Sequence, residues 1–563
     1  MGKTTRITMV IVLLCGNATF AFAADPPSRI LFNAEILTMD DNNQVVHALA
    51  ITGDRILAVG SNAEIKKRAT AQTEMIDVGG RTIIPGLIDT HLHAIRGGQT
   101  YLFETYWYDA TSLKSALDEL KTTAAKRGPG KWVTVAGSWS PAQFEENRAP
   151  SVEDLNAALP SNPAYVQYLY DYAILNDKGM EALGLNKEGA ALPGMEIEKD
   201  PQGKPTGKLF GNIGSFSFLL NKISAAKDDE RKESLAAYFA VLNSRGVTGI
   251  VDAAGGGTGA PIYDPLFSLW QEGKLPLRVA YRISAQTPGN EAGWFASTTA
   301  YLPPRFGDAM LKFLGLGEVL VFRVNDGVRL APGFQAAQDG KDELYKVAML
   351  AAHRKYPLEI HAYTNDAAKQ ILDVFERVSE SVDFRSLRWC IAHISTGTPD
   401  TFERMKKLGL CYTVQMGPYY EAFQIAQANG LAVGEATPPV KLAMKSGVTV
   451  VGGTDSTRIG EFNTWRAVEY QITGRAVGGS VQRRKDLGLT RQEALKLYTS
   501  NASWATFDEG QRGTLESGKL ADLAILDQPY LTIAEDKIHT LKSQLTLVGG
   551  KVVHSTEPFS AVK

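Results

Sequence analysis

The middle of the chain alternates short apolar runs with amphipathic stretches. Eight apolar runs have the length and composition of β-strands, at residues 82–89, 247–252, 277–284, 318–324, 358–361, 388–393, 410–414 and 448–454. Helical patterns follow most of them, as at residues 366–379 and 399–408. This alternation predicts βα units around a parallel sheet. Because eight such strands close a (β/α)8 TIM barrel, we expect an α/β protein with that barrel at residues 81–509.

Both ends of the chain show shorter β-rich runs that are separated by turn residues. The N-terminal runs are residues 30–32, 48–52 and 56–59, and the C-terminal runs are residues 523–526, 544–548 and 552–554. Gly549 and Gly550, between the last two runs, are typical of a tight hairpin turn. We expect residues 25–80 and 510–563 to pair into one small composite β-sandwich, with the barrel inserted between them.

A long segment separates the first two predicted barrel strands. It contains two more strand-like runs, residues 132–136 and 164–169, and a group of aromatic residues, namely Trp132, Trp139, Tyr165, Tyr168, Tyr170 and Tyr172. We interpret residues 101–245 as mainly an insertion that caps the barrel mouth. Aromatic residues at strand spacing more often pack in a core than line a pocket, so packing is their expected role and a substrate pocket is the alternative.

The first residues have the order of a secretory signal peptide. Lys3 and Arg6 precede an apolar run at residues 7–14, and Ala21-Phe22-Ala23 offers small residues at the positions that a signal peptidase reads. The apolar run is far shorter than the roughly 20 residues of a membrane-spanning helix. We therefore expect residues 1–24 to be removed by cleavage after Ala23 or Ala24, which would release a periplasmic or secreted protein without a membrane span.

Charge and cysteine content exclude several classes of function. The 59 Lys and Arg residues nearly balance the 61 Asp and Glu residues, so nothing steers the chain toward nucleic acid or acidic lipid and we expect no nucleic-acid partner, while a homo-oligomer stays open. After cleavage only Cys390 and Cys411 remain, which gives neither a disulfide framework nor a cysteine-based metal site. We expect both thiols to be buried packing residues. A metal site would therefore use histidines and carboxylates.

Two histidines end the first predicted barrel strand. The run Pro85-Gly86-Leu87-Ile88-Asp89-Thr90 leads into His91-Leu92-His93. Residues two apart on a strand face the same side, so both imidazoles point the same way. Two imidazoles on one face supply half of a divalent-metal site. The alternative is a pair of polar residues at the start of a loop, and the preceding Pro-Gly-Leu-Ile-Asp run favours the metal site.

Three more metal-competent side chains lie at the ends of other predicted strands. His361 ends Leu358-Glu359-Ile360, His393 ends a run that contains Cys390, and Asp455 follows the apolar run 448–454. The C-terminal ends of barrel strands converge on one mouth, where active sites form. A single such residue is more often a turn or core residue. Four strands that each end in one are better explained by a shared metal ion.

These residues together resemble the amidohydrolase superfamily, and within it the YtcJ-like branch with N-substituted formamide deformylases and exoenzyme-regulatory proteins. The resemblance covers nearly all of the mature chain. Its matching pieces are residues 85–93, Asp200-Pro201-Gln202-Gly203-Lys204-Pro205-Thr206-Gly207, His361-Ala362, Ala392-His393, Gly453-Thr454-Asp455 and residues 513–526.

The resemblance implies a barrel with a composite β-sandwich and a metal-dependent hydrolase. By position, His91, His93, His361, His393 and Asp455 would bind one or two divalent ions, with zinc as the expected metal, and Asp455 would also be the catalytic proton shuttle. The implied reaction is hydrolysis of an amide-like C–N bond of a small molecule. Ester hydrolysis and deamination use the same parts and stay open. The alternative of another class is a non-catalytic regulatory or binding protein that retains this fold.

One departure from the family pattern concerns the fourth barrel strand. Many members carry there a carbamylated lysine that bridges two metal ions, whereas residues 317–327 contain no lysine. Glu318 could supply a bridging carboxylate directly, or the site could hold one ion. At the start of the predicted strand 318–324, Glu318 would point away from the mouth, which argues against a ligand role. The number of ions therefore stays open.

Overall fold

The computed structural model describes residues 26–187, 190–224, 226–255 and 259–563. The predicted signal peptide, residues 1–24, lies outside the described residues, so cleavage and export stay predictions. Within the described ranges, the structure contains no helix with the length and apolar character that crossing a membrane requires.

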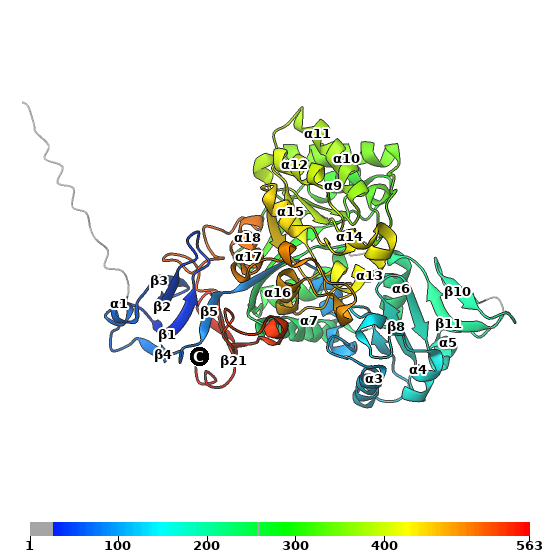
Figure 1. The fold of residues 1–563 in the computed structure, drawn as a ribbon, viewed down its shortest axis with the longest axis horizontal. Coiled ribbons are helices and arrows are strands. Elements are labelled where there is room, and N and C mark those ends of the chain that lie inside the picture. Colours follow the sequence, from blue (N-terminus) through cyan, green and yellow to red (C-terminus); the bar gives the residue numbers. More distant parts are fainter. Residues whose placement is uncertain (1–25, 188–189, 225, 256–258) are drawn as a thin grey trace, which may run out of the picture.

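Strands from both ends of the chain form one eight-stranded sheet. They are β1 (Arg29–Leu37), β2 (Val45–Thr52), β3 (Arg55–Gly60), β4 (Glu74–Asp77), β5 (Thr82–Pro85), β19 (Leu523–Leu526), β20 (Ser543–Val548) and β21 (Lys551–Ser555). The order is β21-β20-β19-β5-β1-β2-β3, with β4 beside β1, and the antiparallel pair of β19 and β5 joins the two ends (Figure 1). Helix α1 (Asn62–Lys66) follows β3. The sandwich architecture and its boundaries stay predictions.

Eight short strands in the middle of the chain form two parallel four-stranded sheets. One contains β6 (Leu87–Leu92), β12 (Val247–Asp252), β13 (Arg278–Ile283) and β14 (Leu311–Leu316). The other contains β15 (Glu359–Ala362), β16 (Cys390–His393), β17 (Cys411–Val414) and β18 (Thr449–Gly452). Nearly every residue of these strands is buried, as expected for parallel sheets covered by helices.

The two parallel sheets approach each other at both edges. An isolated parallel bridge pairs Leu316, at the end of β14, with Leu358 next to β15. At the opposite edges, the backbone N–H of Asp455 donates to the carbonyl oxygen of His91 over 2.9 Å. The number of strands and these two links agree with an eight-stranded barrel. The closure of the barrel itself stays a prediction.

Helices surround these strands and bury apolar faces against them. They are α2 (Ala94–Gly98), α7 (Asp228–Asn243), α8 (Asp264–Gln271), α9 (Glu291–Thr298), α10 (Gln338–His353), α11 (Asn365–Ser379), α12 (Pro399–Lys407), α13 (Gly417–Asn429), α14 (Leu431–Gly434), α15 (Val440–Lys445), α16 (Thr464–Thr473), α17 (Arg491–Leu497) and α18 (Ser500–Ala505). In α11, the Thr364 side chain caps the N-terminus and Ile371 and Phe375 lie on the buried face. The sequence pattern of the helix thus fixes which side meets the strands.

Two predicted strands differ from the structure, and glycines explain both differences. The predicted strand 82–89 is divided at Gly86 between β5 and β6, where a Cβ atom would lie only 2.2 Å from the Thr248 side chain. The predicted fourth strand, 318–324, is wrong: the strand is β14, and residues Phe322–Val324 form a 3-10 helix. Gly317 ends this part of the chain with φ +142°, a conformation that favours glycine.

The segment between β6 and β12 builds a separate sheet with its own apolar core. Its strands are β7 (Val133–Val135), β8 (Ala164–Tyr168), β9 (Tyr172–Leu175), β10 (Glu196–Lys199) and β11 (Pro205–Phe210), in the order β10-β11-β9-β8-β7. Helices α3 (Leu113–Arg127), α4 (Val152–Ala158), α5 (Asp177–Leu183) and α6 (Ile213–Ile223) belong to the same segment (Figure 1). Helix α7 instead packs Leu235 and Phe239 into the core of the central strands.

The two cysteines that were expected to be separate packing residues form a disulfide. Cys390 of β16 and Cys411 of β17 lie directly opposite each other in the parallel register and are bonded. Both are buried, as predicted. The sequence did not reveal the bond, because the register in which two strands separated by a helix pair cannot be deduced from the residues of either strand.

Candidate metal centre

The five predicted metal ligands converge at the C-terminal ends of the parallel strands. His91 lies in β6 and His93 directly follows it, His361 lies in β15, His393 ends β16, and Asp455 follows β18. All five side chains are buried, and His91 has no exposed surface. Residues spread over most of the chain therefore meet at one place, as the barrel topology predicts.

Glu318 lies at the centre of this cluster, which corrects the expectation that it faces away. Because β14 ends at Leu316, Glu318 follows the strand at the mouth instead of starting it. Its Oε1 lies 3.4 Å from His93 Nε2, and its Oε2 lies 3.7 Å from His91 Nε2. The same Oε2 lies 3.2 Å from His361 Nδ1 and 3.3 Å from His393 Nε2. One carboxylate thus contacts all four histidines.

Asp455 closes the cluster from the β18 side. Its Oδ1 lies 3.2 Å from His93 Nε2 and 3.9 Å from His91 Nε2, and its Oδ2 lies 3.8 Å from His393 Nδ1. Three groups of ligand atoms lie within 4.8 Å of one another, namely those of His91, His93 and Glu318, of His91, His393 and Asp455, and of Glu318, His361 and His393. Glu318 belongs to two of the three groups.

A buried carboxylate that the sequence analysis did not identify orients His91. Glu359 Oε1 lies 2.6 Å from His91 Nδ1, and its other oxygen accepts a hydrogen bond from the Thr413 hydroxyl at 2.6 Å. The opposite ring nitrogen, His91 Nε2, is buried among the other ligands and has no hydrogen-bond partner. A buried polar atom without a partner is costly in a folded protein. A cation at this point would satisfy it, so the residues fit a metal ion.

Backbone carbonyls orient two other rings in the same manner. His93 Nδ1 donates to the carbonyl oxygen of Ala254 at 2.8 Å, and His361 Nε2 donates to that of Gly327 at 2.7 Å. Since a carbonyl oxygen only accepts, each ring keeps its proton on that nitrogen and presents the other nitrogen to Glu318. Such outer hydrogen bonds are the usual means by which proteins fix the tautomer of a metal-binding histidine.

The pKa values of the cluster reflect a competition between burial and charge. Burial alone would raise the pKa of Glu318, but hydrogen bonds from His361 and His393 and the nearby imidazoles outweigh it and hold the pKa well below its ordinary value. Burial would lower the pKa of His91, yet the carboxylates, Glu359 foremost, raise it to about 10. Without a cation the carboxylates thus recruit protons onto histidine. Metal binding would displace those protons.

The cluster opens into a small cavity of about 50 Å³. Polar residues of its wall outside the cluster are Arg96, Tyr170, Asn325 and Tyr363, and the apolar ones are Ile213, Val319, Val328 and Ile459. Tyr170 stands in the turn between β8 and β9 of the inserted sheet. Among the aromatic residues of that segment, Trp139, Tyr165 and Tyr168 pack in its core as expected. Tyr170 also lines the cavity, which is the alternative role.

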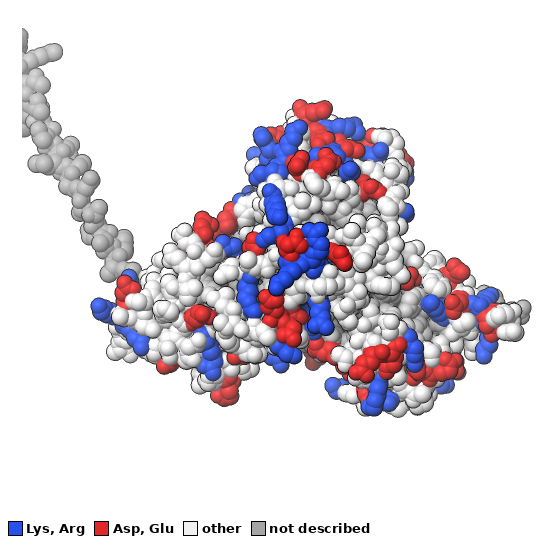
Figure 2. Space-filling view, in the orientation of Figure 1, with Lys and Arg blue, Asp and Glu red and all other residues white. Residues whose placement is uncertain are grey.

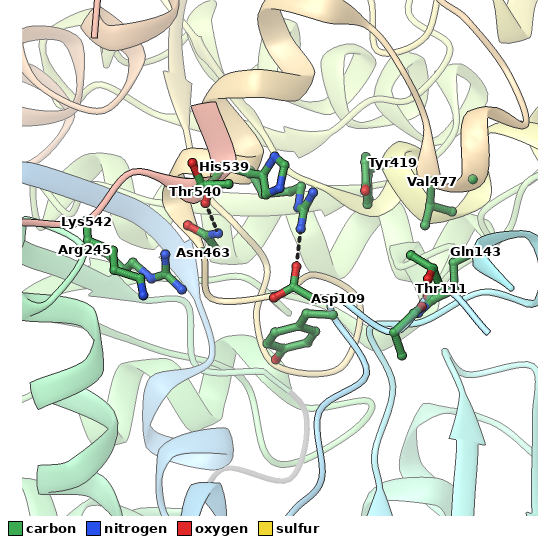
Figure 3. A pocket seen from close by; sticks show the side chains of 14 residues that line it. Asp109, Thr111, Gln143, Arg245, Tyr419, Asn463, Val477, His539, Thr540 and Lys542 are labelled. Atoms are coloured by element: carbon green, nitrogen blue, oxygen red, sulfur yellow. Dashed lines mark hydrogen bonds and ion pairs between the residues drawn. The ribbon is translucent and has the colours of Figure 1, made fainter. Parts of the chain in front are cut away.

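A larger cavity of about 640 Å³ lies elsewhere, between the inserted segment, helix α16 and the C-terminal part of the chain (Figure 3). Three of its ionisable side chains are paired. Arg466 contacts Asp109 at 2.7 Å and Glu461 at 2.8 Å, and His539 Nδ1 contacts Glu469 at 2.7 Å. No set of ligand atoms like that of the metal centre is found here among the described residues.

Comparison with known proteins identifies the family. The family model described as "Amidohydrolase family" matches residues 74–554 of the chain. The chain belongs to this family. The match includes all five predicted ligands and Glu318, so the resemblance inferred from the sequence motifs is confirmed.

Relatives in several organisms support this assignment over nearly the full length. An N-substituted formamide deformylase of Arthrobacter pascens is 25% identical, with coverage of 92% of this chain and 97% of that protein. The putative amidohydrolase YtcJ of Bacillus subtilis is 22% identical, with coverage of 92% and 98%. These matches place this amidohydrolase in the YtcJ-like branch of the family.

Two solved structures show the same fold. An uncharacterized metal-dependent hydrolase from Pyrococcus furiosus superposes with a TM-score of 0.64 at 21% identity and covers 90% of this chain and 100% of its own. A mutant of the atrazine chlorohydrolase from Arthrobacter aurescens, complexed with zinc and atraton, gives a TM-score of 0.52 at 15% identity, with coverage of 94% and 95%.

Proposed function

We propose that this amidohydrolase is a metal-dependent enzyme that hydrolyses an amide-like C–N bond of a small molecule. The observation that carries the proposal is the buried His91 Nε2, which lacks a partner although three other histidines and two carboxylates surround it. Such a set of imidazoles and carboxylates suits zinc, whose ligands in proteins are nitrogen, sulfur and oxygen atoms. The deformylase relative and the zinc-bound structural neighbour support the same assignment.

The distribution of ligand atoms favours two ions rather than one. His91, His93 and Asp455 would hold one ion and His361 and His393 the other, with Glu318 shared between them. Glu318 then takes the place of the bridging lysine that the chain lacks. When bound, the ions supply Lewis-acid chemistry: they lower the pKa of water toward about 7 and polarise a substrate carbonyl.

Asp455 has the position of a proton shuttle. Its carboxylate is buried in the wall of the cavity, and its neighbouring imidazoles outweigh burial and lower its pKa, so it is ionised at neutral pH. It would accept a proton from the attacking water and return it to the leaving nitrogen. Glu359 and the carbonyl oxygen of Ala254 hold His91 and His93 in place throughout. The apolar wall excludes bulk water from the reacting groups.

The proposal is tested by metal analysis and by activity on a panel of N-formyl and N-acyl amines before and after chelation. We expect about two zinc ions per chain and hydrolysis that chelation abolishes and zinc restores. An exposed histidine provides the control, because His353→Ala in α10 should leave both metal content and activity unchanged. A protein that holds no metal and is inert on amides, esters and aminohydrolase substrates would support the non-catalytic alternative.

We further infer that the protein is exported. The signal-peptide pattern of residues 1–24 supports this, and the Cys390–Cys411 bond is of the kind that persists in an oxidising compartment. Cell fractionation with N-terminal sequencing of the mature protein tests it. We expect a chain in the periplasm or medium that begins at residue 24 or 25, and a full-length cytoplasmic chain would contradict the inference.

A further inference from the structure

Two polar side chains of the metal cavity have buried atoms without a partner. Tyr170 is 8% exposed and its hydroxyl makes no hydrogen bond, and the Nε atom of Arg96 is likewise buried and unpartnered. Both residues line the same cavity as His93, Glu318 and Asp455. Tyr363, the other hydroxyl of the wall, is already engaged, because it donates to the Glu421 carboxylate.

Neighbouring carboxylates do not explain Arg96. Asp252 is a nearby acid whose pKa burial raises, and its two oxygens accept the backbone N–H groups of Ile95 at 2.8 Å and Ala254 at 3.0 Å. No ion pair of Arg96 is present in the part of the chain that the structure describes. The buried Nε of Arg96 thus lacks an acceptor, and a buried donor without a partner is costly for the fold.

We propose that Arg96 and Tyr170 bind a carboxylate of the substrate, which makes the substrate class an N-acyl or N-formyl derivative of an apolar amino acid. A guanidinium only donates hydrogen bonds and matches a carboxylate in a bidentate manner, and a tyrosine hydroxyl adds a further donor. The scissile amide then lies between this anchor and the metal cluster. This inference rests on the proposed hydrolase function and specifies its substrate.

The remaining wall limits the rest of the substrate. Ile213, Val319, Val328 and Ile459 offer an apolar surface, and the cavity of about 50 Å³ favours a short side chain and a short acyl group. Cations held by the cluster would offset Glu318 and Asp455, so that the cavity attracts an anion. Tyr170 reaches the cavity from the inserted sheet, so the insertion itself contributes to substrate selection.

Matched substrates test the anchor. N-formylalanine and N-formylvaline are compared with N-formylethylamine and N-formylisobutylamine, which differ only in lacking the carboxylate, and both enantiomers of each acid are used. We expect kcat/KM of the zinc-loaded full chain to be about a hundred-fold higher for the preferred enantiomer of the acid, as two charge-assisted hydrogen bonds provide. Equal rates for acid and amine, or a preference for the amine, would overturn the proposal.

Variants of Arg96 and Tyr170, which form the proposed carboxylate anchor, distinguish loss of substrate binding from loss of the fold. Arg96→Met should remove most of the hundred-fold preference for the acid over the amine, and Tyr170→Phe should reduce this preference by roughly ten-fold. Arg96→Lys keeps the charge and should retain an intermediate preference. Arg68→Met, which replaces an exposed arginine in the turn after α1, is the control for loss of one charge and should change nothing. An unchanged preference in Arg96→Met would refute the anchor.

A binding measurement distinguishes failure of the anchor from failure of the hydrolase. Calorimetry of N-formylvaline with the zinc-loaded chain does not require turnover. Binding at least ten-fold tighter to the wild type than to Arg96→Met supports the anchor even if no amide is cleaved, in which case only the proposed reaction fails. Equal binding to both proteins overturns the anchor whatever the activity.

Discussion

Two cavities of this molecule differ in an instructive way. The cavity of about 640 Å³ is large (Figure 3), and its Arg466 and His539 contact carboxylates, although the buried hydroxyl of Tyr108 in its wall has no partner. The cavity of about 50 Å³ is small, yet three histidines and two carboxylates of the cluster line it, together with Arg96 and Tyr170, whose Nε atom and hydroxyl are buried without partners. Converging imidazoles and carboxylates beside unsatisfied polar atoms mark the candidate site, whereas empty space alone does not.

A pair of one histidine and one glutamate near each cavity illustrates the difference. Glu359 contacts His91 Nδ1 at 2.6 Å in the metal centre, and Glu469 contacts His539 Nδ1 at 2.7 Å beside the larger cavity. Only the first pair is fully buried and directs its free nitrogen at further ligands. On the face that Figure 2 shows, acidic and basic side chains are interspersed.

The largest effect is expected for Asp455→Asn. Loss of the proton acceptor and of one ligand should lower kcat by about 10³-fold or more. Steady-state kinetics with metal analysis measure this. Asp109→Asn, which removes a carboxylate of the larger cavity, is the matched control and should leave kcat/KM within two-fold. A comparable loss in both variants would break the distinction between the cavities.

The next effect concerns the shared carboxylate. Glu318→Gln keeps the shape of the side chain but removes the charge that two groups of ligands share. We expect about one of the two ions to be lost, and activity to fall by roughly a hundred-fold or more. Elemental analysis after dialysis measures the metal content. Retention of two tightly bound ions would show that Glu318 is not the bridge.

A smaller effect is expected for the residue behind the ligands. Glu359→Gln leaves all ligands in place and should weaken zinc binding by about 10- to 100-fold, because the carboxylate no longer fixes and polarises His91. Competition with a chelator of known affinity measures this. The control is Glu469→Gln, which changes the equivalent pair at His539. The zinc affinity of this variant should equal that of the wild type.

The smallest effect tests whether paired buried charges serve the fold instead of the chemistry. Asp508 contacts Lys312 at 2.5 Å and Arg512 at 2.9 Å, and although burial opposes it, these cations lower its pKa from 3.8 to about 2. Its folded pKa lies below the unfolded value, so the stabilisation is complete above about pH 4 and is lost as the pH falls through about 2. Asp508→Asn should therefore cost about 2 kcal/mol of unfolding free energy at pH 7.

Urea denaturation at pH 7 and at pH 3 measures the effect of Asp508→Asn, and the difference from the wild type should shrink at the lower pH. The kcat of the folded variant should not change at neutral pH. A variant that is fully stable but slow would place Asp508 in the chemistry and contradict the comparison.

The sequence located the strands and the candidate ligands where a polar residue ends an apolar run. His361, His393 and Asp455 each end such a run, and the structure brings them together with His91 and His93. The fourth strand could not be placed, because residues 311–322 are almost continuously apolar and the period alone does not locate the strand. That error also misplaced Glu318.

Other features of the site depend on contacts between distant segments. Glu359 reads as an interior residue of its strand, and its role appears only when β15 and β6 face each other across the centre. Arg96 and Tyr170 come from a helix after β6 and a turn of the inserted sheet, so their common cavity is a property of the tertiary fold. The Cys390–Cys411 bond likewise depends on a register between neighbouring strands.

The antiparallel pair of β5 and β19 has a consequence for how the molecule is made. β5 is separated from β6, the strand of His91, only by Gly86, and it lies between β1, which is synthesised first, and β19, which is synthesised near the very end of the chain. A ribosome must therefore release almost the whole polypeptide before β5 is paired on both sides. Premature stops soon after residue 510 would leave every candidate ligand encoded but β5 paired on one side alone.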